Sequence, residues 1–143
     1  MSDPLTIHIE IGGDAKEALE RLADGLKGTE LTEGIGLEVV KLSRNRITDR
    51  KNTAPDGSKW APLSPSTLKR KKAKGFGHQG TLMQTNTLWR SIQADNVTDT
   101  SVDVGAMSVY AMIHQKGGKA GRGHKATIPA RPYIGISLRS RIV

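Results

Sequence analysis

The hydrophobic pattern changes period within the first thirty residues, and this change limits the folds open to the chain. The first apolar residues alternate with polar ones: Leu5, Ile7, Ile9 and Ile11. Alternation of this kind is typical of a half-buried strand. Apolar residues then recur at spacings of three and four between Ala15 and Leu26, which is the period of an amphipathic helix. We therefore predict a strand at 4–11, ended by Gly12 and Gly13, and a helix at 15–27.

Capping residues and turn signals predict three further helices. Thr32 is placed to cap a helix at 32–50, although Gly34 and Gly36 weaken its first turns. After a loop at 52–62, Ser64 and Pro65 have the order of an N-cap and first helical residue, which predicts a short helix at 65–74. A further helical stretch is expected at 85–93.

The last third of the chain carries strand signals separated by glycine. Val97, Val102 and Val104 flank polar residues and predict a hairpin. A short helix or turn is expected at 110–115, a flexible basic loop at 116–125, a short strand at 127–128, and a strand or helical turn at 134–138. Together these elements predict one α+β domain over residues 1–143: a small antiparallel sheet with two main helices packed on it, and long basic loops.

Charge is unevenly distributed along the 143 residues. Residues 1–40 hold 9 acidic and 3 basic side chains, residues 41–75 hold 2 acidic and 11 basic ones, and residues 76–143 hold 3 acidic and 8 basic ones. Such a division favours head-to-tail pairing of identical subunits, and it equally favours contact with nucleic acid or an acidic protein. Aromatic residues make up only 3% of the chain, so we expect part of the apolar surface to be buried against other subunits.

This chain lacks the residues and spacings that most catalytic and metal-binding sites require. There is no cysteine, which excludes thiolate metal sites and disulfides. The four histidines do not have metal-ligand spacing, and His114 is interpreted as a hydrogen-bonded structural residue. Gly118 and Gly123 match the glycine spacing of a phosphate-binding loop, but His124 and Lys125 follow where the motif needs Lys and a hydroxyl. We expect no catalytic residue, no metal, no cofactor and no membrane span.

Two basic clusters are the candidate contacts with a partner: Lys69, Arg70, Lys71 and Lys72, and then Lys119, Arg122 and Lys125. They are suited to phosphate or to carboxylates of a neighbouring subunit, and no base-reading motif accompanies them. Trp60 has two interpretations, as a core anchor covering the helix ends or as an interface hot spot.

Several blocks then follow one another in a recognisable order. The first is Asp56-Gly57-x2-Trp60-x-Pro62-Leu63, and the second is Leu82-x2-Thr85-x2-Leu88-x2-Ser91-Ile92. The most specific blocks are Tyr110-Ala111-x-Ile113-His114-Gln115-x-Gly117 and Ile128-Pro129-Ala130-Arg131-Pro132-Tyr133-Ile134-Gly135. Over about residues 41–138 the chain resembles the phage virion morphogenesis family, the tail-completion proteins of Mu-like and P2-like tailed phages. It departs from the family at Asn86, often Gly, and at Lys116, often aromatic.

The resemblance implies a non-enzymatic virion protein that acts in tail completion or head–tail joining. It implies a ring at the neck or top of the tail, six-fold by analogy with other small neck proteins, and contact with other neck and tail proteins. It also implies location in the virion, with assembly in the host cytoplasm. The motif residues expected to be structural are Gly57, Trp60, Pro62, Leu63, Tyr110, His114, Gln115, Gly117, Pro129, Arg131 and Pro132. The alternative is a small basic DNA-binding protein that touches packaged DNA nonspecifically.

Overall fold

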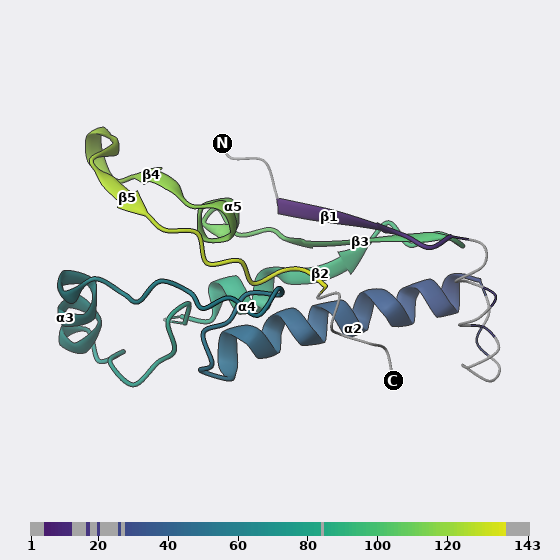
Figure 1. Ribbon diagram of the computed structural model, residues 1–143, viewed down its shortest axis with the longest axis horizontal. Helices are drawn as coiled ribbons and strands as arrows, with labels where there is room; N and C mark the ends of the chain where they lie inside the picture. Colours follow the sequence, from purple (N-terminus) through teal and green to yellow (C-terminus); the bar gives the residue numbers. More distant parts are fainter. Residues whose placement is uncertain are drawn as a thin grey trace.

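A three-stranded antiparallel sheet covered by one long helix forms the centre of the fold (Figure 1). The computed structural model describes residues 5–12, 17, 20, 26, 28–83 and 85–136. Strand β1 (Leu5–Glu10), strand β2 (Ile92–Asp95) and strand β3 (Ser101–Ala106) lie in the order β1-β3-β2. Helix α2 (Thr29–Thr48) runs along one face of this sheet. The α+β prediction is confirmed, and the helix predicted at 15–27 lies outside the described residues except at 17, 20 and 26.

The register of the sheet explains which side chains are buried. Leu5 pairs with Ala106, Ile7 with Val104 and Ile9 with Val102, and residues directly opposite one another share a face. On β3, Val102, Val104 and Ala106 are fully buried. The opposite face is polar, and there His8 Nδ1 lies 2.5 Å from Asp103 Oδ1. Hydrogen bonds from Asn96 and His8 lower the pKa of Asp103.

Helix α2 approaches the sheet closely at a glycine. A Cβ on Gly36 would lie 2.6 Å from Val102 Cγ2 and 3.2 Å from Ala94 Cβ. The glycine that weakens the helix in isolation is therefore required by packing. Val39, Val40 and Ile47 continue the buried side of the helix.

The start of α2 differs from the prediction. Thr32 lies within the helix, because α2 begins at Thr29 and its N-cap residue is Gly28. The buried Thr32 hydroxyl donates to the carbonyl oxygen of Thr98 in the β2–β3 connection. Thr32, which was predicted to cap the helix locally, instead connects α2 to the β2–β3 hairpin, 66 positions away in the sequence.

Shorter elements surround this centre. Helix α3 (Pro65–Ala73) begins as predicted, with Ser64 Oγ accepting from the Thr67 amide at 3.3 Å. Helix α4 (Thr87–Ser91) is shorter than predicted, since Ile92 already belongs to β2. The predicted hairpin is formed by β2 and β3, and Val97 lies in the connection between these strands. Asn86 precedes α4 in the left-handed region with φ 62°, a conformation that asparagine tolerates at the position where glycine was expected.

The segment predicted as a flexible basic loop has regular structure. After helix α5 (Ala111–Lys116), strand β4 (Gly118–Ala120) pairs with strand β5 (Ala126–Ile128). The short helix η1 (Arg122–His124) makes the turn between them. Gly121 and Gly123 have φ of 81° and 70°, so the glycines supply left-handed turn conformations. The predicted strand at 127–128 is confirmed as part of β5. Of the strand or helical turn predicted at 134–138, residues 134–136 lie outside the helices and strands, and residues 137–138 lie outside the described residues.

Candidate functional site

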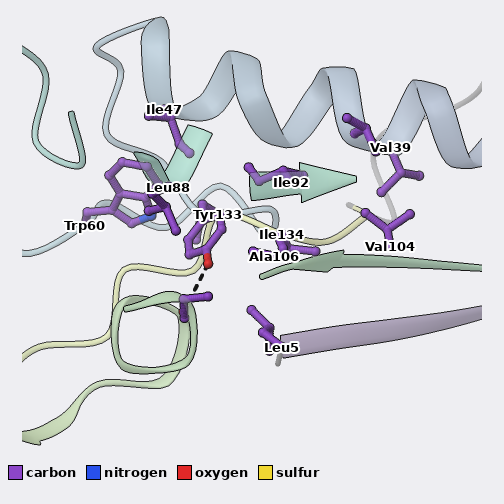
Figure 2. Packing of buried hydrophobic residues seen from close by; sticks show 13 residues of the cluster. Leu5, Val39, Ile47, Trp60, Leu88, Ile92, Val104, Ala106, Tyr133 and Ile134 are labelled. Carbon is purple, nitrogen blue, oxygen red and sulfur yellow. Dashed lines mark hydrogen bonds between the residues drawn. The ribbon is translucent and has the colours of Figure 1, made fainter. Parts of the chain in front are cut away.

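The segment 130–135, near the end of the described residues, is held by side chains from three distant parts of the chain. Tyr133 and Ile134 are buried in the same cluster as Trp60, Leu88 and Ile47, near the C-terminal end of α2 (Figure 2). The Tyr133 hydroxyl donates to the carbonyl oxygen of Ala111 at 3.0 Å. Burial raises the pKa of Tyr133, so the phenol stays protonated and keeps this hydrogen bond.

Gln115 binds this segment from the side of α5. Its Oε1 accepts from the amides of Tyr133 at 3.0 Å and Ile134 at 3.1 Å, and its Nε2 donates to the Ile134 carbonyl oxygen at 2.9 Å. Three backbone groups without a strand partner are thereby satisfied, as buried polar groups require.

Arg131 connects the segment to the loop that follows Trp60. Only 4% of Arg131 is exposed. Its Nε and Nη2 donate to the carbonyl oxygens of Ala61 at 2.8 Å and Pro62 at 3.0 Å. Burial lowers the pKa of the guanidinium. The contacts are to neutral carbonyls, so the role of this arginine is to join two loops.

Trp60 and Arg46 complete the set. The indole Nε1 of Trp60 donates to the Pro132 carbonyl oxygen at 2.7 Å, and 6% of the residue is exposed. The core interpretation of Trp60 is therefore confirmed. Arg46 of α2 donates through Nη1 to the carbonyl oxygens of Tyr133 at 3.2 Å and Gly135 at 2.8 Å. The sequence did not single out Arg46, because it is one of several cations near the C-terminus of a predicted helix.

Gly117 lies where α5 turns into β4. Its φ is 72°, and a Cβ there would lie 2.7 Å from the Ala130 amide nitrogen. The Arg131 amide also donates to the His114 carbonyl oxygen at 2.7 Å. Motif residues therefore hold both ends of the β4–β5 hairpin together: His114 and Gly117 before β4, and Arg131 after β5.

His114 is half-buried beside this closure. Its ring Nδ1 has no hydrogen-bond partner in the part of the chain that the structure describes. Burial, and then the nearby charge of Arg131, lower the pKa of His114. The expected side-chain hydrogen bond is therefore absent at Nδ1, and the hydrogen bond that His114 accepts from Arg131 is made by its backbone carbonyl.

The remaining motif residues differ in exposure. Gly57 forms a turn with φ 88°, and its amide donates to the Ala54 carbonyl oxygen at 2.9 Å. Leu63 and Pro132 are half-buried, while Pro62 and Pro129 are exposed. Tyr110 is 61% exposed and lies beside Met107 and Val109, which are 61% and 71% exposed.

The predicted contact residues fall into two groups at one end of the molecule. Lys69, Arg70 and Lys72 are exposed on α3, and Lys119, Arg122 and Lys125 are exposed on the β4–β5 hairpin. Figure 1 shows α3 and the hairpin at the same end of the long axis. Lys71 differs, because only 7% of it is exposed and its Nζ donates to the Gly80 carbonyl oxygen at 2.7 Å.

A family model described as the phage virion morphogenesis family matches residues 13–142. The chain belongs to the phage virion morphogenesis family. Among curated proteins it is 49% identical over 57 residues to Mu-like prophage FluMu G protein 2 from Haemophilus influenzae, a match covering 39% of this chain and 41% of that protein. It is 32% identical over 83 residues to an uncharacterized protein from Methanocaldococcus jannaschii, covering 57% of this chain and 58% of that one.

No solved structure matches the chain. The family model and the Mu-like prophage relative support a role in phage virion morphogenesis. Among the described residues, no helix combines the length and apolarity needed to cross a membrane. The described residues also contain no group of three or more His, Cys, Asp or Glu side chains arranged to hold a metal ion.

Proposed function

We propose that this chain completes the phage tail or joins the head to the tail, as a closed ring of identical subunits at the neck or top of the tail. In this proposal it catalyses no reaction, and its partners are other copies of itself and neighbouring neck and tail proteins. It resides in the virion after assembly in the host cytoplasm. Six-fold symmetry is the expectation by analogy with other small neck proteins.

The observation that carries the proposal is the way the chain holds its basic hairpin. Gly117, Gln115 and Arg131 close the base of β4–β5, while Lys119, Arg122 and Lys125 are exposed on the hairpin. A virion-assembly protein with cations displayed on a fixed arm is suited to bind acidic surfaces of neighbouring components.

Exposed apolar residues support self-assembly. Met107, Val109 and Tyr110 stand together between β3 and α5 and are each more than half exposed. A group of large apolar side chains on one loop is typical of a surface that is covered in an assembly. A heterologous contact, with one patch meeting a different patch, closes into a ring when its rotation allows.

Electron microscopy of particles from a phage lacking this gene tests the proposal. We expect filled heads and tails that fail to join, or tails of irregular length, and we expect complementation by the gene to restore joined particles. Infectious particles of normal appearance without the protein would contradict it. Light scattering of the purified chain should also show an assembly that grows with concentration.

DNA binding is the second candidate, favoured by the exposed cations that α3 and the hairpin place at one end. Contacts to phosphate weaken steeply with salt. Retention on duplex DNA at low salt and release at high salt, with no change in oligomeric state, would favour this candidate. An assembly that survives high salt would favour the ring.

A further inference from the structure

A basic pocket lies between α3 and the segment that follows it. The pocket has a volume of about 380 Å³. Its lining includes three cations, two leucines and a histidine: Arg50, Lys71, Lys72, Leu63, Leu68 and His78. Leu68 is 44% exposed at its edge. The pocket therefore combines positive charge with an apolar wall.

The charge in this pocket lacks a counter-charge. Lys71 is 7% exposed, and its Nζ donates to the carbonyl oxygens of Gly80 and, at 3.5 Å, Gln79. Arg50 donates to the His78 carbonyl oxygen at 2.7 Å. Carbonyl oxygens satisfy hydrogen bonds without neutralising the cations, and no described carboxylate lines the pocket. Buried charges in proteins are normally paired, so the pocket is suited to an anion from outside.

The exposed side of α2 presents a complementary acidic face, made of Glu30, Glu33, Leu37 and Glu38. The spacings of three and four place Glu30, Glu33 and Leu37 on one side of the helix, and Glu38, the residue after Leu37, lies on the flank of that side. Leu37 is 56% exposed between the glutamates, and all three glutamates are exposed. None of the glutamates forms an ion pair with a residue that the structure describes.

The pocket and the acidic face are far apart within one subunit. The acidic face occupies the N-terminal half of α2, and α3 lies beyond the C-terminal end of that helix (Figure 1). Even Glu38, the last residue of the acidic face, lies ten residues before the end of α2 at Thr48, which is about 15 Å along the helix. The two surfaces can therefore meet only between subunits.

We infer that the acidic face of α2 in one copy of this chain docks on the basic pocket of the next copy. A glutamate carboxylate meets Lys71, Lys72 and Arg50, and Leu37 packs on Leu68 at the pocket edge. A duplex DNA backbone offers phosphates on a convex surface and no apolar group for Leu68. The inference rests on the ring of the proposed function and names the surfaces that form its subunit contact.

Charge exchange between the two surfaces tests the inference. Lys72→Glu and Glu38→Lys are made singly and together, and sedimentation velocity measures assembly against concentration. Each single variant should need at least about tenfold more protein for half-assembly, because like charges then face each other across the contact. The double variant, and an equimolar mixture of the two singles, should regain assembly because opposite charges face each other again.

Matched controls separate this contact from general charge effects. Lys74→Glu makes the same change at the exposed C-cap of α3, outside the pocket lining, and Glu10→Lys makes it on β1 outside the acidic face. Both should assemble like the wild type. Equal loss in controls and test variants, or a double variant as weak as the singles, would overturn the inference.

Three other outcomes would also overturn it, each for a different reason. If the wild type assembles and both single variants assemble equally well, these surfaces are not the subunit contact, but the ring itself is not contradicted. A wild type that stays monomeric at all concentrations would reject the ring as well. Loss of duplex-DNA retention in Lys72→Glu but not in Lys74→Glu, with self-assembly unchanged, would show that the pocket binds DNA.

Discussion

The side-chain amide of Gln115 pairs with the backbone of Ile134 in both directions. Gln115 Nε2 donates to the Ile134 carbonyl oxygen at 2.9 Å, and the Ile134 amide donates to Gln115 Oε1 at 3.1 Å. A glutamine here replaces the neighbouring strand that an extended segment otherwise needs. The segment is thus held in the core without joining a sheet.

Gln115→Ala should destabilise the fold by about 2–4 kcal/mol, because several partly buried backbone groups lose their partners. Urea unfolding at neutral pH measures the loss. Lys116→Ala, on the exposed next residue, should stay within about ±0.5 kcal/mol. Equal stabilities for the two variants would show that the amide pairing contributes nothing.

Trp60→Ala should lower the free energy of unfolding by about 3–5 kcal/mol, since a large buried ring is removed. Trp60→Phe keeps most of the apolar volume and loses the hydrogen bond to Pro132, so it should cost less than the alanine change. Thermal unfolding followed by circular dichroism measures both. A phenylalanine variant as unstable as the alanine variant would locate the whole effect in the indole N–H.

Gly117→Ala and Gly57→Ala form a matched pair. Both glycines have positive φ, 72° and 88°, but a Cβ on Gly117 would lie 2.7 Å from the Ala130 nitrogen and one on Gly57 would meet nothing within 4 Å. The Gly57 variant should cost about 1 kcal/mol through backbone conformation alone. The Gly117 variant should cost clearly more, and equal melting temperatures for the pair would contradict the close approach.

His114 predicts a dependence of stability on pH. Burial lowers its pKa in the folded protein, so below the unfolded value of about 6.5 the unfolded chain binds the proton more strongly. Stability should therefore fall as pH drops from about 7 until it passes the folded pKa. Urea unfolding across this range should show a shallower slope for His114→Phe than for the wild type. His124→Asn, at an exposed histidine, should keep the wild-type slope, and an unchanged slope in His114→Phe would refute the assignment.

The hairpin cations should matter for assembly and not for folding. Replacing Lys119, Arg122 and Lys125 with Ser changes three exposed residues, each worth within about ±0.5 kcal/mol. Head–tail joining should weaken, and the defect should resemble that of raised salt in the wild type. If the triple serine variant gives wild-type particle yields across salt concentrations, the hairpin acts only as a spacer.

Local patterns predicted the elements whose signals are self-contained. Ser64 and Pro65 predicted the start of α3, and the alternation from Leu5 predicted β1. The short hairpin at 118–128 was missed because its glycines and cations have the composition of a mobile loop. Its strands have only three residues each, too few for a periodic pattern.

The site could be predicted only in part, because it is formed by contacts between segments that are distant in the sequence. The motif blocks named Trp60, Gln115 and Arg131, but spacing gave no sign that all three would meet at 130–135. Arg46 donates to the Gly135 carbonyl oxygen from 89 positions away, and the buried Lys71 donates to the Gly80 carbonyl oxygen nine positions later in the sequence. Nothing in a lysine-rich stretch distinguishes the one lysine that turns inward.

The pairing of Leu5 with Ala106 and the burial of Tyr133 have a consequence for how the subunit is made. The first strand emerges from the ribosome long before its partner, and the core stays open until residue 135 has emerged. Contacts of such wide sequence separation form late and slowly. The nascent chain therefore cannot present finished assembly surfaces, and subunits become competent to associate only after nearly all of the described chain has been synthesised.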